Sequence, residues 1–320
     1  MNHTRTFYEG MKSKMVVYKK ESLDIEKYNH ILPARLWNRN LWSGIRKAAI
    51  SYFTGKKIKW HNQRDNLLSS QILCVNIFFP LRNHPSLVGG FLGEFYPSLA
   101  KVTDIDFEYI GPKNYLNEPG GRGYNRTSVD VSITWQDTKG KNNLLLVEFK
   151  FTEPNFGECS KSANPDWDRC NHGELIISSH KTQCYRSEKN RTYWDRILSP
   201  QGPFIREMLN KTQYCPFRYD FYQLMRNQLL AKCIAWNEDS GFSIVEFAVC
   251  YDDRNKTLLN LSHPVDGNSN PLTSWKSFLK DKNTFKHFTI QQFLEYIDHI
   301  DNLPSELAQW RAYLNKRYGL

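Results

Sequence analysis

The sequence lacks several features that would place it in other protein classes. It contains no apolar run long enough to span a membrane, and its first fourteen residues are polar and basic, without the apolar centre of a signal peptide. It has no internal repeat and no low-complexity stretch, which argues against solenoid and fibrous architectures. Its seven cysteines are an odd number and include no CxxC pair, which fits a reducing compartment better than a disulfide framework. We therefore expect a cytoplasmic protein that does not enter the membrane.

Positive charge is concentrated at one end of the chain. The formal net charge is +10, and residues 1–64 contain fourteen Lys and Arg against four Asp and Glu, whereas the remaining residues contain 29 of each. A basic block beside a neutral core attracts polyanions such as nucleic acids. Taken alone, the charge favours the simpler interpretation of a solvated basic surface. Arg35 and Arg39 are the candidates in this block for contacts to a nucleic acid.

The most informative pattern is an acid and a base two residues apart in an apolar run. Glu148 and Lys150 share one face of a predicted strand, because strand side chains repeat with period two. Asp130 lies in a second alternating run, and the polar stretch 137–143 between them predicts a hairpin loop. A loop centred near its middle places Asp130 opposite Glu148. Hard divalent cations need such a meeting of carboxylates, and so does metal-assisted phosphodiester hydrolysis.

A simpler interpretation of this pattern is a cluster of surface ions. Short motifs of this type arise by chance, since charged residues at the end of a strand are usually solvated. The surroundings of Glu148 and Lys150 argue against it, because the other residues of the run are almost wholly apolar. A buried charge is costly unless it is paired or binds a metal.

The order of the predicted elements indicates an α/β fold. The sequence predicts a partly loose start over 1–30, helices over 32–53, 67–79 and 85–97, a strand over 102–110, the hairpin over 128–151, an irregular insertion with short helices over 152–216, a helix over 217–236, a strand over 242–251, and helices over 274–280, 290–300 and 304–318. An αβββαβ order makes a mixed central sheet flanked by helices. We divide the chain into a basic N-terminal helical extension (1–64), a core with the insertion (65–260), and a C-terminal helical segment packed on the core (261–320).

This order and these residues resemble the PD-(D/E)XK, or restriction-endonuclease-like, nuclease superfamily, and within it a poorly characterised bacterial branch. The resemblance runs with gaps from about residue 65 to about residue 250 and is carried by Ser69-Ser70-Gln71 with residues 74–78, by residues 126–130, by residues 148–153, and by residues 222–230 around Gln223. The ordered set is more specific than the ExK element alone. The chain departs from the pattern in having Ser-Val rather than proline before Asp130, and in its long insertion.

The resemblance implies a role for each member of the site. Asp130 and Glu148 would bind Mg²⁺ or Mn²⁺, and Glu94 on the preceding helix would give a further carboxylate, although a surface acid is an equally good interpretation of Glu94. Lys150 would orient or deprotonate the attacking water, since a lysine near a cation can have a lowered pKa. Gln223 would hydrogen-bond the water or the phosphate.

Three further residues are predicted to contact the nucleic acid. Arg226 lies one helical turn beyond Gln223, and Arg126 precedes the strand of Asp130. Gln71 would approach phosphate near the start of its helix, where backbone N–H groups favour anions. Ser69 is slightly more consistent with an N-cap than with phosphate binding.

Four cysteines fall in the insertion, namely Cys159, Cys170, Cys184 and Cys215. Four thiolates could hold a structural Zn²⁺ or an iron–sulfur cluster. Their spacings of ten, thirteen and thirty intervening residues match no compact metal-binding pattern, so independent thiols are the favoured interpretation.

The function predicted from these observations is a Mg²⁺-dependent endonuclease acting on double-stranded DNA, in restriction or phage defence. One alternative is a nucleic-acid-binding module with a nuclease-like fold and no catalysis, and another is an RNA or repair nuclease on the same fold. The intact Asp130, Glu148 and Lys150 favour an active enzyme. A homodimer is a further expectation, since a two-fold pair cuts both strands of a symmetric site most simply.

Overall fold

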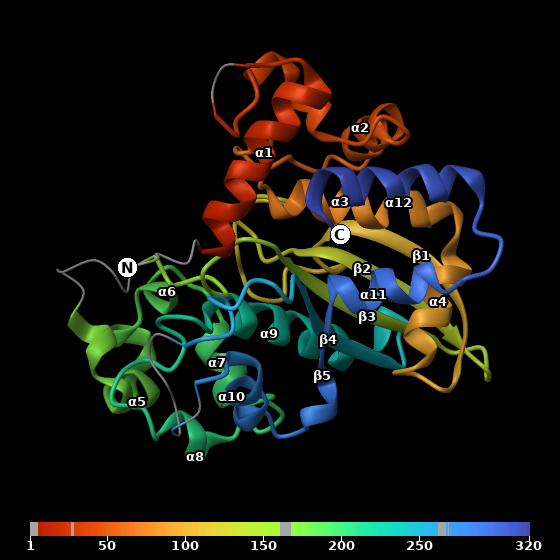
Figure 1. Ribbon diagram of the computed structural model, residues 1–320. Coiled ribbons are helices and arrows are strands. Elements are labelled where there is room, and N and C mark those ends of the chain that lie inside the picture. The colour runs from red at the N-terminus through yellow and green to blue at the C-terminus, as the bar shows by residue number, and fades with distance from the viewer. Residues whose placement is uncertain (1–5, 27–28, 161–167, 262–266, 268) are drawn as a thin grey trace.

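A mixed five-stranded sheet forms the centre of the molecule (Figure 1). The computed structural model describes residues 6–26, 29–160, 168–261, 267 and 269–320. The strands lie in chain order, as β1 (Leu99–Tyr109), β2 (Val129–Asp137), β3 (Asn142–Lys150), β4 (Ile244–Tyr251) and β5 (Phe285–Thr289). The first three are antiparallel neighbours, whereas β4 runs parallel to β3 and β5 parallel to β4. This confirms the predicted α/β class with a mixed sheet.

The hairpin of β2 and β3 has the predicted register. Trp135 pairs with Asn143, and the turn between the strands is closed by the Asp137 side chain, which accepts the backbone N–H groups of Lys139 and Lys141 at 2.9 Å each. Gly140 occupies the turn with φ +75°, a conformation that other residues rarely adopt. The loop is therefore centred where the polar stretch predicted it.

Helices cover both faces of the sheet and divide the core in two. One cluster contains Leu145, Val147 and Phe149 of β3, and the other contains Leu144 and Leu146, as period-two alternation requires. The first face is covered by α3 (Ser70–Phe78), α4 (Pro85–Gly93), α11 (Ile290–Asp298) and α12 (Ser305–Tyr318), and the second by α7 (Tyr193–Leu198), α9 (Tyr222–Trp236) and α10 (Pro271–Phe278).

The N-terminal region is more ordered than the sequence predicted. The stretch expected to be loose forms α1 (Phe7–Leu23), which is capped by Thr6 and buries Met11 and Met15. Its helical pattern is weak in sequence, and the helix is stabilised by packing against α12. The predicted single helix over 32–53 is instead a 3₁₀ helix, η1 (Ala34–Asn40), followed by α2 (Arg46–Gly55).

The C-terminal segment contributes a strand as well as helices. The sequence prediction missed β5, because its five residues are too few for a clear period. Thr289 at its end also caps α11 through a capping box with Gln292. Buried contacts then join the two ends of the chain, since Trp310 donates to the Asn76 carbonyl at 2.7 Å and Arg317 donates to the Asn40 carbonyl at 2.5 Å.

The insertion after β3 consists of loops and short helices, as predicted. Its helices are η3 (Asp168–Asn171), α5 (Gly173–Gln183), α6 (Tyr185–Glu188), α7 and α8 (Arg206–Leu209). The remaining short elements of the chain are η2 (Pro80–Asn83), η4 (Glu238–Ser240) and η5 (Lys282–Thr284). Among the described residues, no helix has both the length and the apolar character needed to cross a bilayer.

Candidate active site

A row of three carboxylates crosses the sheet where β1, β2 and β3 lie side by side. Val131 of β2 pairs with Phe107 on one side and with Val147 on the other. One step along, the same register places three acids beside one another, namely Glu108, Asp130 and Glu148. The predicted juxtaposition of Asp130 and Glu148 is therefore present, and the structure adds a third acid from β1.

Glu148 is buried and fully engaged by polar partners. Its side chain lies within a core element and the residue is 3% exposed. The carboxylate accepts Gln223 Nε2 at 2.6 Å and Asn227 Nδ2 at 2.8 Å, and it lies 3.0 Å from Lys150 Nζ. Such pairing is what a buried charge requires.

Lys150 is held from two sides. Its Nζ donates to Gln223 Oε1 at 2.6 Å in addition to its ion pair with Glu148. Burial lowers the pKa of Lys150, but the charges of Glu148, Glu153 and Asp130 more than offset this, so its pKa is raised. The sequence predicted a lowered pKa beside a bound cation, and the three carboxylates around Lys150 act in the opposite direction.

The crowded row of carboxylates makes ionisation of Asp130 unfavourable. One of its oxygens accepts the backbone N–H of Phe149 at 2.7 Å, which fixes the carboxylate against β3. Burial and the charges of Glu148 and Glu108 raise the pKa of Asp130 well above its ordinary value. A divalent cation beside Asp130 and Glu148 would relieve this repulsion.

The helix α9 carries the amides that hold the acid and the base together. Gln223 and Asn227 are one turn apart and therefore lie on one face of the helix. The predicted helix over 217–236 begins later, at Tyr222, so Gln223 lies in its first turn. Sequence analysis found Gln223 but missed Asn227, although the spacing of four residues is a signal that could have identified it.

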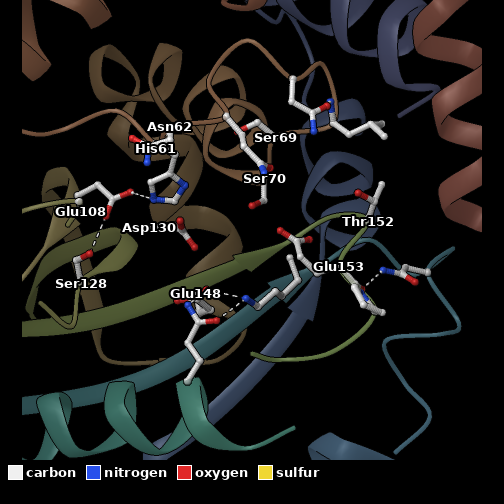
Figure 2. A pocket seen from close by; sticks show the side chains of 18 of the residues that line it. His61, Asn62, Ser69, Ser70, Glu108, Ser128, Asp130, Glu148, Thr152 and Glu153 are labelled. Atoms are coloured by element: carbon white, nitrogen blue, oxygen red, sulfur yellow. Dashed lines mark hydrogen bonds and ion pairs between the residues drawn. The ribbon is translucent and has the colours of Figure 1, made fainter. Parts of the chain in front are cut away.

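Opposite this helix, a second group of side chains surrounds Glu108 (Figure 2). Glu108 is 2% exposed and accepts Ser128 Oγ at 2.7 Å and Gln71 Nε2 at 2.5 Å. Nε2 of His61 lies 3.4 Å from the same carboxylate. His61 was not predicted from the sequence, because a lone histidine in a basic loop carries no pattern.

His61, Glu108, Ser128 and Gln223 line one cleft with a volume of about 900 Å³. Asp130, Glu148 and Lys150 lie on its floor, and Arg126 and Arg226 reach it from the sides. Figure 2 shows the labelled carboxylates directed into this cleft, with His61 above them. The cleft therefore places two arginines beside a carboxylate site, and arginine side chains of this kind can attract a phosphodiester.

The predicted residues differ in how well the structure places them for a role. Arg35 and Arg39 lie on η1 and do not line the cleft, so any contact they make to a nucleic acid is outside it. Gln71 is 2% exposed and its amide is engaged by Glu108 and His61, so its place is within the wall of the site.

Glu94 was wrongly placed by the sequence prediction. It follows the last residue of α4, is exposed, and lines a separate depression with Glu295 and His299. The predicted helix ends earlier than expected, and the chain then turns into β1, which carries the third acid of the row instead. That acid is Glu108.

The residues present fit a hard divalent cation. Asp130 and Glu148 supply neighbouring carboxylate oxygens, and Mg²⁺ commonly takes one or two protein carboxylates with waters and substrate phosphate. Within the described ranges, no group of three or more His, Cys, Asp and Glu side chains has the geometry to hold a metal. The metal predicted here would therefore depend on water and substrate oxygens for the rest of its shell.

The four cysteines of the insertion come into one neighbourhood. The Cys215 N–H donates to the Cys170 carbonyl at 2.9 Å, and the Cys159 N–H donates to the Arg218 carbonyl at 3.1 Å. Burial raises the pKa of Cys215, and the charges of Cys184, Cys170 and Cys159 add to the effect. No disulfide joins them. A structural metal at these thiols stays a prediction, to be tested by metal analysis of the purified protein.

Comparison with known proteins gives one match. A family model described as Restriction Endonuclease associating with ARP matches residues 1–319. No curated protein and no solved structure matches the chain.

Proposed function

Because the chain belongs to the family of restriction endonucleases associating with ARP, we propose that it is a metal-dependent endonuclease that hydrolyses phosphodiester bonds in double-stranded DNA. The family description supports a nuclease and a nucleic-acid substrate. The observation that carries the finer proposal is the set of Asp130, Glu148 and Lys150 in one cleft, with Glu148 and Lys150 held by Gln223.

In this proposal Asp130 and Glu148 hold Mg²⁺ or Mn²⁺. When bound, such a cation lowers the pKa of a coordinated water and offsets charge on the phosphate. The chain's own residues do the positioning. The Phe149 N–H fixes Asp130, and Asn227 and Gln223 fix Glu148. These contacts keep the two carboxylates in place before substrate arrives.

Lys150 acts on the attacking water and the scissile phosphate. The ammonium group of Lys150 donates a hydrogen bond to Gln223 Oε1 at 2.6 Å, which directs this group towards the cleft rather than towards solvent. With the carboxylate charges offset by a cation, Lys150 can orient the water and take its proton. The charge of Lys150 also attracts the phosphate.

Arg226 and Arg126 would contact the nucleic-acid backbone beside the reacting phosphate. Both line the cleft. Arg226 is held by Thr127 Oγ1 at 2.8 Å and lies 3.5 Å from Glu118, which positions its guanidinium at the wall. Contacts of this type position a duplex without reading its sequence.

The biological setting that we propose is defence against foreign DNA, with a partner of the kind the family description calls ARP. A two-fold pair of chains would cut both strands of a symmetric site. Size-exclusion chromatography with light scattering, with and without duplex, tests whether such a pair forms.

The test of the nuclease proposal is cleavage of supercoiled plasmid, linear duplex and single-stranded DNA with Mg²⁺ or Mn²⁺. We expect metal-dependent cutting by the wild type and a loss of roughly 100-fold or more for Lys150→Ala. Lys139→Ala in the exposed hairpin turn is the matched control and should cut normally. Absence of cutting, together with salt-sensitive binding by all three proteins, would identify a binding module instead.

A further inference from the structure

The wall of the cleft opposite α9 carries a histidine and a carboxylate that the proposed mechanism does not use. We propose that His61 is the general acid that protonates the leaving oxygen of the scissile phosphodiester, with Glu108 as its positioning residue. This inference rests on the proposed nuclease function and assigns that function a second proton-transfer group.

Glu108 is built into the sheet in an unusual way. It lies on β1 in register with Asp130, yet its backbone has φ +48°, in the left-handed region. This conformation is uncommon for a residue with a side chain. Arg122 stabilises it, since its Nε donates to the Glu108 carbonyl at 3.2 Å and its guanidinium also pairs with Asp106 at 2.6 Å. The fold therefore holds the Glu108 carboxylate in one direction, towards the cleft.

The hydrogen bonds of Glu108 tie it to the wall of the cleft that carries His61. One oxygen accepts Ser128 Oγ at 2.7 Å, and the other accepts Gln71 Nε2 at 2.5 Å and lies 3.4 Å from His61 Nε2. Both oxygens are thus engaged by neighbours on their own wall.

A hydrogen bond fixes the backbone of His61, whereas its imidazole ring is partly exposed. Its N–H donates to Gln71 Oε1 at 2.9 Å, so one glutamine side chain holds both His61 and Glu108. The His61 side chain is 45% exposed and lines the cleft. Figure 2 shows the ring projecting into the cleft, with one edge against Glu108. Among the described residues, none bonds to the other ring nitrogen, Nδ1, so it can meet substrate.

The charges around His61 favour its protonated form. Burial lowers the pKa of His61, but contact with the Glu108 carboxylate and the charges of Glu108 and Glu148 more than offset this, and Lys150 opposes them. The resulting pKa lies above the ordinary value, so an imidazolium is available near neutral pH. A general acid needs this protonation state before the bond breaks.

The position of His61 complements that of Lys150. Lys150 projects from β3 beside α9, and His61 contacts β1, two strands away, so the acids of β2 and β3 lie between them. Phosphoryl transfer needs the attacking and leaving oxygens roughly in line on opposite sides of phosphorus. A phosphate above the row would present one side to Lys150 and the other to His61.

Each proton that moves in this step has a donor and an acceptor. With the carboxylate charges offset by a bound cation, neutral Lys150 accepts a proton from the attacking water as the water oxygen forms the new bond to phosphorus, and Lys150 later releases that proton to solvent. The bond between phosphorus and the leaving oxygen breaks, and that oxygen takes its electron pair together with a proton from the His61 imidazolium. Neutral His61 then regains a proton from solvent, and no oxidant or further reactant is required.

The test uses a leaving group that needs no proton. A short duplex is prepared twice, once natural and once with sulfur in place of the leaving oxygen at one cleaved position, after the product ends have shown which oxygen leaves. A thiolate leaves without protonation. We expect His61→Asn to cut the natural duplex about 100-fold more slowly or worse and the sulfur duplex within about threefold of the wild type.

Equal losses on both duplexes would overturn the inference, because a histidine that only binds phosphate or supports the fold affects both alike. His84→Asn is the matched control, since His84 also pairs with a glutamate, at 2.5 Å from Glu306, but does not line the cleft. Thermal melting and duplex binding in Ca²⁺ verify that each variant folds and binds. If the wild type cuts neither duplex with Mg²⁺ or Mn²⁺, the nuclease proposal itself fails, and this inference with it.

Glu108→Gln tests the positioning role separately. The amide keeps the size of the side chain and can still accept hydrogen bonds, but it removes the charge facing the imidazolium. We expect the rate of the wild type to fall as pH rises through the pKa of His61, and this fall to occur at lower pH in Glu108→Gln. His61→Asn should lack it. If the cleavage rate of Glu108→Gln fell at the same alkaline pH as the rate of the wild type, this would contradict a role for Glu108 through His61.

Discussion

The side-chain amide of Gln223 meets the carboxylate of Glu148 at 2.6 Å, although 75 residues separate them in the chain. The oxygen of the same amide accepts a hydrogen bond from Lys150 at 2.6 Å. One side chain of α9 therefore fixes both the acid and the base of the ExK strand. The insertion between β3 and α9 can vary in shape without changing this contact, provided that it returns the chain to the same face of the sheet.

Gln223→Ala is expected to slow cleavage by roughly tenfold to 100-fold with little change in DNA affinity. The substitution removes the hydrogen bond that orients the Lys150 ammonium group but leaves Lys150 itself in place. Single-turnover cleavage with excess protein measures the rate, and fluorescence anisotropy in Ca²⁺ measures the affinity. Gln136→Ala is the matched control, since Gln136 bonds only the exposed Asn142 on the hairpin. An unchanged rate for Gln223→Ala would show that Lys150 is positioned by Glu148 alone.

Asp130→Asn is expected to stabilise the metal-free protein at neutral pH by about 1 kcal/mol while abolishing cleavage. Burial and the charges of Glu148 and Glu108 raise the pKa of Asp130. The folded state therefore keeps the proton to higher pH than the unfolded state does, and stability falls as pH rises from the ordinary value of 3.8 towards the raised one. At neutral pH the charge opposes folding, so its removal helps.

Thermal melting without metal and with Mn²⁺ measures both effects of Asp130→Asn. The wild type should gain stability from Mn²⁺, and the variant should not. Asp104→Asn is the control, because Asp104 is half-exposed and lies 4.0 Å from Arg82 outside the cleft. A lower melting temperature for metal-free Asp130→Asn would show that the hydrogen bond to Phe149 outweighs the charge repulsion.

Arg226→Ala is expected to weaken duplex binding. It should also make the slope of the logarithm of the binding constant against the logarithm of the salt concentration shallower, by the amount that about one phosphate contact contributes. The residue lines the cleft, while Thr127 and Glu118 hold its guanidinium from behind. Binding measured across a series of salt concentrations gives the slope. Arg311→Ala removes an arginine that is paired with Asp298 at 2.6 Å outside the cleft, and it should leave the slope unchanged. Equal slopes for Arg226→Ala and the wild type would remove Arg226 from the interface.

His287→Gln is expected to make the protein less sensitive to mild acid. Burial lowers the pKa of His287, and the charge of Lys276 lowers it further. The unfolded chain therefore takes up a proton more readily than the folded one as pH falls below about 6.5, and stability is lost there. Melting temperatures from pH 7.5 to 5 should decline less steeply for the variant than for the wild type. Parallel declines would assign the acid sensitivity to other groups.

Local sequence patterns predicted the centre of the site because its residues lie close together in the chain. Asp130, Glu148 and Lys150 belong to one hairpin, and the number of residues between the two acids sets their register without reference to the rest of the fold. Gln223 was found only through the resemblance to a nuclease superfamily. Its geometry could not be inferred, since 75 residues lie between it and Glu148.

The errors arose where packing between distant segments decides the structure. Glu94 was assigned to the site from its helix, but α4 ends before it and the residue faces a different depression. α1 was not predicted because its sequence is weakly amphipathic, and it is stabilised by α12 from the other end of the chain. β5 was too short to predict and is formed by pairing with β4.

The sequence by itself determined the α/β order of elements, the hairpin, and the acid–base pattern on one strand, because periodicity and turn chemistry act over a few residues. Tertiary structure alone decided that Glu108 stands in line with Asp130, that Gln71 joins Glu108 to His61, and that Gln223 and Asn227 close over Glu148. These contacts bring together residues 10 to 79 positions apart. Only the packing of the sheet against its helices fixes such distances.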